Sequence, residues 1–409
     1  MNTMKKSVLL KAAILSVSAI VTSGSAMNAN IPAMAVSFPT IPYPLIETIS
    51  TIHYFFLIPS VLASVYLSKR IGYKRCIQTG ILIVGLSGIV PVLTNNFYLI
   101  LITRALFGIG IGLFNSLLVE LVNYYFIREE RTNLFGYLGA FEAIGGTIAV
   151  FIAGQLLQIS WQFSTMIYLI AVPIFLLFSF GVPNDSFKEQ DGNDNNKAQI
   201  MDRSRAKNTF KFQGITAAYI VILFVTALLY MTMGIKITSL ITTLGYGTSV
   251  DGSLAVSVSG LGAILSGFLF GRIVGLTRTY TFSFGFATLG LAMLLIGISN
   301  HIWLTFLGSF LVGCGIRIFI PYVTNLINMG NSNNKPLLTS LILVAYNVGC
   351  GLSPYGSLLL EQLSWGNSLR GIFYMEAICF GIMTLLSYCS SRMRTKLDKS
   401  EVWAVEKIN

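Results

Sequence analysis

Charged side chains are scarce in this chain of 409 residues, where Asp, Glu, Lys and Arg together make up 11% of the sequence. An average soluble domain has about 25%. Hydrophobic residues account for 54%, and the 16 acidic residues are outnumbered by 27 Lys and Arg residues. This composition excludes an ordinary soluble domain and indicates a chain that lies largely in a membrane.

Motifs for metal binding, ATP use and covalent chemistry are missing as well. The five cysteines form no Cys-x-x-Cys pair and no His/Cys cluster, so we expect no metal and no other cofactor. No Gly-x-x-x-x-Gly-Lys-Ser/Thr phosphate loop occurs, and ATP-driven transport within this chain therefore has no support. Because no nucleophile, base and orienting group stand together, we do not expect an enzyme.

Twelve apolar stretches follow one another along the chain, and about 20 apolar residues suffice to cross a bilayer as a helix. The first stretch begins like a signal peptide with Lys5 and Lys6, but Lys11 interrupts it and it continues to about Val36. We therefore interpret it as a retained span. The expected spans are residues 10–36, 46–67, 75–93, 97–126, 133–157, 161–181, 214–240, 250–271, 279–299, 302–327, 336–360 and 370–391.

Lys and Arg fall almost entirely into every second connection between these spans, whereas the odd-numbered connections are nearly devoid of them. Connections that retain positive charge are cytoplasmic. The alternation predicts a multi-pass protein of the plasma membrane with both termini in the cytoplasm. Anionic lipid and topology then account for the basic excess, so the bilayer is the expected partner of this charge and nucleic acid is not.

The two halves of the chain repeat one another. Gly110 corresponds to Gly313 at an offset of 203 residues, and Gly145 corresponds to Gly349 at an offset of 204. An offset near half the chain indicates a duplication whose halves are related by an axis along the membrane normal. We predict an all-α membrane protein with 12 transmembrane helices in two pseudo-symmetric six-helix halves. The expected parts are a first half (1–181), a cytoplasmic linker (182–213), a second half (214–391) and a cytoplasmic tail (392–409).

The connection after the second span resembles a motif of the major facilitator superfamily. The family pattern is Gly-x-x-x-Asp-Arg-x-Gly-Arg-(Arg/Lys)-(Arg/Lys), and this chain reads Val65-Tyr-Leu-Ser-Lys69-Arg70-Ile-Gly72-Tyr73-Lys74-Arg75. The resemblance extends over essentially the whole chain and implies the two-half fold and secondary transport by alternating access. In the family the acid of this motif helps to latch the halves on the cytoplasmic side, and Lys69 stands in its place here. The gate residues that the resemblance implies are Lys69, Arg70, Gly72, Lys74, Arg75 and Arg272.

The fourth and fifth spans also resemble the family. Arg104, Gly108 and Gly112 have its Arg-x-x-x-Gly-x-x-x-Gly spacing, and Gly136 and Gly145 have the gap found in its drug/proton antiporters. Glycines four residues apart lie on one helix face and let a neighbouring helix approach closely. We therefore expect Gly108, Gly112 and Gly145 at helix contacts, and the resemblance suggests an exporter.

Several charges lie inside spans, where the alternation does not explain them. Ionisable residues within a membrane are functional by default, and an unpaired carboxylate in hydrocarbon can exist in its neutral form. We therefore predict Glu142, in the middle of the fifth span, as the proton-coupling site, with Arg104 and Glu120 of the fourth span in the same role. The alternative is a buried ion pair of Glu142 with Arg104 that only fixes helix packing.

Arg317 lies deep in the tenth span, and its counterpart in the first half is Phe114. A guanidinium there can bind an anionic group of a substrate, or it can serve as a structural partner for a Glu or for backbone carbonyls. In the first span, many drug antiporters of the family hold an Asp where this chain has only Asn, which carries no proton. The predicted substrate-binding residues are Arg317, Asn28, Asn30, Asn115, Tyr346 and Asn347.

Other polar residues lie near the outer ends of spans. We interpret Lys236 as snorkelling to the membrane interface. Glu47, His53, Glu361, Arg370 and Glu376 are interpreted mostly as interfacial residues.

Together these features predict a secondary active transporter. We expect proton-coupled efflux of a small amphiphilic compound or metabolite by a monomer, with protons or another solute as the coupling partner. One alternative is a proton-coupled symporter or exchanger for an organic anion, which Arg104 and Arg317 suggest. An alternative of another class is a membrane sensor or scaffold that transports nothing.

Overall fold

The computed structural model describes residues 2–183, 214–329, 335–363 and 368–406. Most of the predicted linker (184–213) and the last residues of the predicted tail (407–409) lie outside the described residues. Within the described ranges, all regular secondary structure is helical. The predicted all-α class is therefore confirmed.

The first half makes six crossings, of which the first and sixth are interrupted by 3₁₀ segments. Ser23 illustrates the reason in the first crossing, because its hydroxyl donates to the carbonyl of Ile20 at 2.7 Å, and short polar side chains of this kind weaken a regular helix. The elements are α1 (Asn2–Ser18), η1 (Ser23–Asn30), α2 (Ile31–Ser37), α3 (Tyr43–Ile71), α4 (Tyr73–Leu93), α5 (Phe97–Tyr125), α6 (Arg128–Leu156), α7 (Trp161–Ser164), η2 (Thr165–Ile170) and α8 (Ala171–Gly181).

The second half also makes six crossings. Its elements are α10 (Gly214–Thr243), α11 (Ser249–Thr277), η3 (Arg278–Tyr280), α12 (Thr281–Ile298), α13 (Ile302–Met329), α14 (Lys335–Leu363) and α15 (Leu369–Glu406). Eleven helical runs in the described residues are long and apolar enough to span a membrane, and one of them, Ser249–Ile298, has 50 residues. A single crossing needs about 20 residues. That run contains both α11 and α12, so the described residues make 12 crossings.

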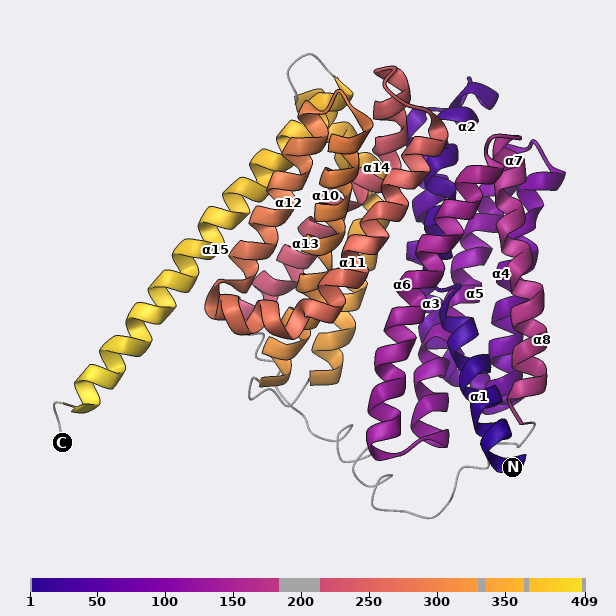
Figure 1. Cartoon of the computed structure of the whole chain (residues 1–409), viewed down its shortest axis with the longest axis horizontal. Helices are drawn as coiled ribbons and strands as arrows, with labels where there is room; N and C mark the ends of the chain where they lie inside the picture. The colour runs from indigo at the N-terminus through magenta and orange to yellow at the C-terminus, as the bar shows by residue number, and fades with distance from the viewer. Residues whose placement is uncertain (1, 184–213, 330–334, 364–367, 407–409) are drawn as a thin grey trace.

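Figure 1 shows the halves as two bundles side by side, with α1–α8 in indigo to magenta and α10–α15 in pink to yellow. The start of α1 and the end of α15 both lie toward the lower edge of this view. We call this end of the molecule the terminal side and the opposite end the far side. The halves meet mainly where α6 packs against α11 and where α3 packs against α14.

The hydrophobic packing shows where the halves are joined. Each half has a large core of its own. A third cluster combines residues of both halves near the far side, among them Met34 and Ile49 from the first half and Met231 and Ile235 from the second. The ribbons of the two bundles diverge toward the terminal side (Figure 1). The halves are thus packed together on the far side in this conformation.

Candidate functional site

A cavity of about 360 Å³ lies between the two halves. Its wall is formed by η1, α3, α5 and α6 of the first half and by α10, α11, α13 and α14 of the second. These are corresponding crossings of the two repeats, as expected for halves related by a pseudo-two-fold axis. The volume is in the range of pockets that hold small organic molecules.

Most of the cavity wall is apolar. Aliphatic side chains such as Val21, Leu57, Val150 and Val256 alternate with a limited number of hydrogen-bonding groups. Apolar walls with few convergent polar groups are typical of small-molecule sites, in which the polar groups fix the orientation of the ligand.

Glu142 and Arg317 lie on opposite walls of this cavity. Glu142 comes from α6 and Arg317 from α13, and both side chains are half-buried. Arg317 is close enough to exert an electrostatic attraction on the Glu142 carboxylate. The ion pairs that the described residues form lie elsewhere, so these two groups face one cavity without neutralising each other by direct contact.

Four other predicted substrate-binding residues also line the cavity, namely Asn28, Asn115, Tyr346 and Asn347. Asn28 is 2% exposed, and its Oδ1 atom has no hydrogen-bond partner. A buried acceptor without a partner is uncommon in folded proteins, and here it lies on the wall of a cavity. Asn347 donates to the carbonyl of Leu343 at 2.7 Å. Whether these residues contact a substrate stays a prediction.

Two tyrosines that were not predicted, Tyr54 and Tyr230, line the cavity beside Tyr346. The hydroxyls of Tyr230 and Tyr346 lie 2.6 Å apart, and their rings are stacked with centroids 6.1 Å apart. Glu142 was predicted because it is a charged residue inside a span. A neutral tyrosine inside a span gives no such signal. His53, interpreted as interfacial, also lines the cavity and is 4% exposed.

Arg104 lies outside the cavity wall, inside the first half. Its guanidinium donates to the hydroxyl of Tyr168 at 3.2 Å and to the carbonyl of Gly88 at 3.1 Å. The rings of Phe107 and Tyr168 each lie 4.9 Å from it. The alternative of an ion pair between Arg104 and Glu142 is therefore wrong, because the described residues form no such pair. The Arg104 cation is instead stabilised by a hydroxyl, a carbonyl and two aromatic faces.

Two further predicted site residues are not on the cavity wall. Asn30 is fully buried, and its side-chain amide donates to the hydroxyl of Ser164 at 2.5 Å and to the carbonyl of Trp161 at 3.4 Å. It therefore joins η1 to α7 and is not among the residues that line the cavity. Glu120 is exposed near the terminal-side end of α5. Proximity to the cavity thus supports Glu142 over Arg104 and Glu120 as a coupling group.

The predicted gate residues lie at the terminal side, between α3 and α4 and along α11. Gly72 connects α3 to α4 with φ +87°, a conformation that favours glycine. The Lys74 ammonium donates to the carbonyls of Ser179 and Val182 at 2.7 and 2.6 Å, which are at the end of the sixth crossing. Lys69, Arg70, Arg75 and Arg272 are exposed, and the Arg70 guanidinium lies 4.7 Å from the Tyr66 ring. These contacts of Arg70 and Lys74 join elements of the first half.

The three glycines predicted at helix contacts lie where helices approach closely. A Cβ atom on Gly108 would overlap the backbone of His53 in α3, and one on Gly145 would overlap the backbone of Ala19. A Cβ atom on Gly112 would lie 2.6 Å from the carbonyl oxygen of Leu57. These contacts hold α5 against α3 and α6 against the first crossing, which positions the cavity wall.

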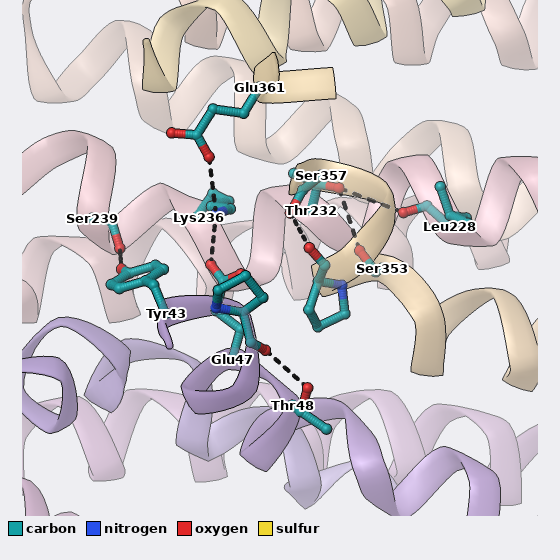
Figure 2. A network of polar contacts seen from close by, with 12 residues as sticks. Tyr43, Glu47, Thr48, Leu228, Thr232, Lys236, Ser239, Ser353, Ser357 and Glu361 are labelled. Atoms are coloured by element: carbon teal, nitrogen blue, oxygen red, sulfur yellow. Dashed lines mark hydrogen bonds and ion pairs between the residues drawn. The ribbon is translucent and has the colours of Figure 1, made fainter. Parts of the chain in front are cut away.

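A buried ion pair at the far side corrects the interfacial interpretation of Lys236 and Glu47 (Figure 2). The Lys236 Nζ atom of α10 lies 2.9 Å from Glu47 Oε1 of α3, and the two side chains are 2% and 0% exposed. Glu361 of α14 lies 3.9 Å from the same ammonium. Lys236 does not snorkel, because the opposite half covers it.

The ion pair belongs to a larger polar group, the far-side cluster, consisting of Tyr43, Glu47, Lys236, Glu361 and Glu376. The Tyr43 ring lies 5.1 Å from Lys236 Nζ, and its hydroxyl forms a 2.5 Å hydrogen bond with Ser239 of the second half. Glu376 of α15 is fully buried rather than interfacial. Its carboxylate lies near the charge of Lys236 and beside Thr232. The cluster joins elements of both halves.

Comparison with known proteins agrees with this architecture. The profile of the Major Facilitator Superfamily matches residues 13–354. Among solved structures, the chain is similar to a crystal structure of a point mutant of the nucleoside transporter NupG, with a TM-score of 0.75 and 12% sequence identity over 93% of this chain and 99% of that one. At this identity the likeness establishes the fold alone. The profile covers well over half of the chain, and the protein therefore belongs to the major facilitator superfamily of secondary transporters.

Proposed function

We propose that this transporter exports a small amphiphilic compound or metabolite in exchange for protons, by exposing the central cavity alternately to the two sides of the plasma membrane. The observation that carries the proposal is the position of Glu142, a membrane-embedded carboxylate on a cavity wall that faces Arg317 of the other half. Both groups are available to a ligand in the cavity because they do not form a direct ion pair.

The lining of the cavity supports an amphiphilic substrate. An apolar body can pack against the aliphatic side chains of both halves, while polar groups reach Asn28, Asn115 and Asn347. The tyrosines of the wall add flat aromatic surface with polar tips. This combination suits a molecule with an apolar part and a few polar groups better than a strongly hydrated ion.

The position of Glu142 supports exchange with protons. A carboxylate on the wall of a cavity between two low-dielectric halves is neutral when protonated and anionic when not. A cationic or strongly polar ligand beside the anionic form disfavours proton binding, so ligand and proton compete. By linkage, competition between two ligands for one site favours their movement in opposite directions.

We take the terminal side as cytoplasmic, because the basic connections lie there and positive charge is retained on that side. The far-side packing then closes the cavity toward the exterior, and the conformation described is the one that receives substrate from the cytoplasm. The single chain is the proposed transport unit.

A second candidate is proton-coupled symport of an organic anion, which the position of Arg317 favours. An anion bound to this guanidinium would neutralise the positive charge that attracts the Glu142 carboxylate. Proton binding to Glu142 would then become easier, and anion and proton would move together. The two candidates therefore predict opposite signs of coupling between ligand and proton.

The test starts with a thermal-shift screen of the purified protein, including nucleosides, organic anions and amphiphilic cations, because a ligand that binds the folded state raises its stability. Flux of each ligand found is then measured in inside-out vesicles with an imposed pH gradient. We expect uphill accumulation by the wild type, loss of uphill accumulation with Glu142→Gln, and retention with Glu129→Gln. Glu129 is the matched control because it is an exposed acid on the same helix.

Each outcome separates the alternatives. Unchanged uphill flux in Glu142→Gln would show that Glu142 is not the coupling group, and Glu120→Gln then becomes the next variant. Accumulation of a ligand that moves in the same direction as the protons, rather than in the opposite direction, would favour the anion symporter. Binding without flux of any ligand would favour the sensor or scaffold.

A further inference from the structure

The ammonium of Lys236 has carboxylates on both halves of the transporter. Glu47 of the first half lies 2.9 Å from it, and Glu361 of the second half lies 3.9 Å from it. Glu376, also of the second half, acts on it by charge. One buried cation thus has three acidic neighbours, of which only Glu47 belongs to the opposite half.

The bond between Lys236 and Glu47 has to break whenever the far side opens. Lys236 lies on α10 and Glu47 on α3, so the ion pair crosses the boundary between the halves. The same boundary is crossed by the Tyr43–Ser239 hydrogen bond and by the hydrogen bond from the Thr51 hydroxyl to the Gly351 carbonyl at 3.2 Å. Among these cross-half contacts, the ion pair is the one between two charged groups.

Breaking this ion pair while both groups remain charged separates two buried charges in a low-dielectric region, and a buried charge left without a partner is strongly unfavourable. The cost falls on Glu47 rather than on Lys236. Lys236 keeps Glu361 and Glu376 as counter-ions in its own half, whereas the charged groups that face Glu47 are Lys236 and, across it, Glu361. Tyr43 is the other titratable neighbour. Glu47 therefore needs another cation when the halves part.

We propose that Lys236 and Glu47 form an ion-pair switch of the far-side gate, in which Glu47 binds a proton from the far side. Protonation of Glu47 breaks its ion pair with Lys236. Lys236 then keeps Glu361 and Glu376 as its partners, and the gate can open. The proton bonds to a Glu47 carboxylate oxygen and removes its charge, and the ammonium retains its counter-ions in the second half. The switch rests on the proposed alternating access. It adds a second proton site, separate from Glu142, that controls opening rather than substrate exchange.

The proposed switch predicts in which direction pH shifts the equilibrium between the closed and the open far side. Protonated Glu47 no longer attracts Lys236, so acidification shifts the equilibrium toward the open far side. Replacement of Glu47 by Gln mimics the protonated form at every pH. Glu47→Asp retains a carboxylate and preserves the response to pH.

The experiment measures the distance between spin labels on the full-length protein in nanodiscs. Labels are placed by Val36→Cys at the end of α2 and Leu363→Cys at the end of α14, which lie on opposite halves and are 83% and 71% exposed. The five native cysteines are replaced beforehand, and retained flux of a ligand from the screen is required. The matched control is Glu130→Gln, which removes the partner of Lys11 in an exposed 2.6 Å ion pair within the first half.

We expect a short distance at alkaline pH and a growing population of a longer distance as the pH falls. In Glu47→Gln the longer distance should dominate at all pH values, with the open-to-closed ratio raised by about tenfold or more at alkaline pH, where tenfold corresponds to about 1.4 kcal/mol. Glu130→Gln should follow the parent protein.

Two results would overturn the switch. If Glu47→Gln shows the same pH-dependent shift as the parent, Glu47 is not the proton site, although alternating access stands. If neither pH nor ligand produces a second distance in any variant, alternating access itself fails. Should Glu47→Gln not fold, Lys236→Gln breaks the same ion pair from the other side, and an unchanged pH response there would equally refute the proposal.

Discussion

The central cavity and the far-side cluster use the same chemistry in opposite ways. Each places an acid of the first half opposite a base of the second, Glu142 with Arg317 in the cavity and Glu47 with Lys236 at the far side. In the cavity the two groups are half-buried and do not touch. At the far side they are almost completely buried and 2.9 Å apart.

The difference between these two pairs follows from how closely the halves approach. At the far side the packed halves bury both Glu47 and Lys236, so their charges are stabilised by neighbouring protein groups rather than by solvent. In the cavity, space remains for a ligand or water beside each charge. The contact between Glu47 and Lys236 therefore stabilises the packing of the halves. Glu142 and Arg317, which are not in contact, are suited to bind a ligand between them.

The largest effect should come from removing Lys236. Lys236→Ala leaves the buried Glu47 and Glu376 without their cation, which costs about 3–5 kcal/mol for a broken buried pair. Lys11→Ala removes a partner from a pair whose side chains are 34% and 47% exposed, and the cost of an exposed pair is at most about 1 kcal/mol. Thermal unfolding of both variants in the same detergent measures the difference. Equal stability losses would refute the contrast between buried and exposed pairs.

A smaller effect is expected in the cavity. Arg317→Ala should leave the thermal stability close to that of the wild type, because the described residues form no ion pair with Arg317. For a ligand with an anionic group, it should weaken binding by about tenfold, or about 1.4 kcal/mol. Calorimetric titration measures this affinity, with Arg392→Ala as the control, since Arg392 is exposed on α15. Unchanged affinity for every ligand found would remove Arg317 from the binding site.

The fold was predictable from the sequence because two simple patterns determine it. The alternation of basic connections requires an even number of crossings, and the repeat at an offset near 203 residues places the two halves in correspondence. The interruptions of the first and sixth crossings were not predicted, because the spans were identified by their apolar residues, and this criterion does not show where short polar side chains such as Ser23 interrupt the regular helix. The boundaries of the linker stay a prediction.

The site was only partly predictable. Depth along a span identified Glu142 and Arg317, and the structure places both on the cavity wall. Depth could not show which neighbours a side chain meets. It therefore associated Arg104 with Glu142, although Tyr168 and Gly88 hold Arg104 instead. Lys236 was assigned to the membrane interface because it lies near the end of a span. A single sequence shows that distance, but it does not show that the other half covers Lys236.

The most direct test is to measure protons as a ligand binds. A pH indicator follows the purified protein in weakly buffered detergent solution while a ligand from the screen is added. Exchange at Glu142 predicts release of about one proton for each ligand bound. This release should be absent in Glu142→Gln and unchanged in Glu129→Gln. Binding without proton release in the wild type, or equal release in Glu142→Gln, would contradict proton exchange at Glu142.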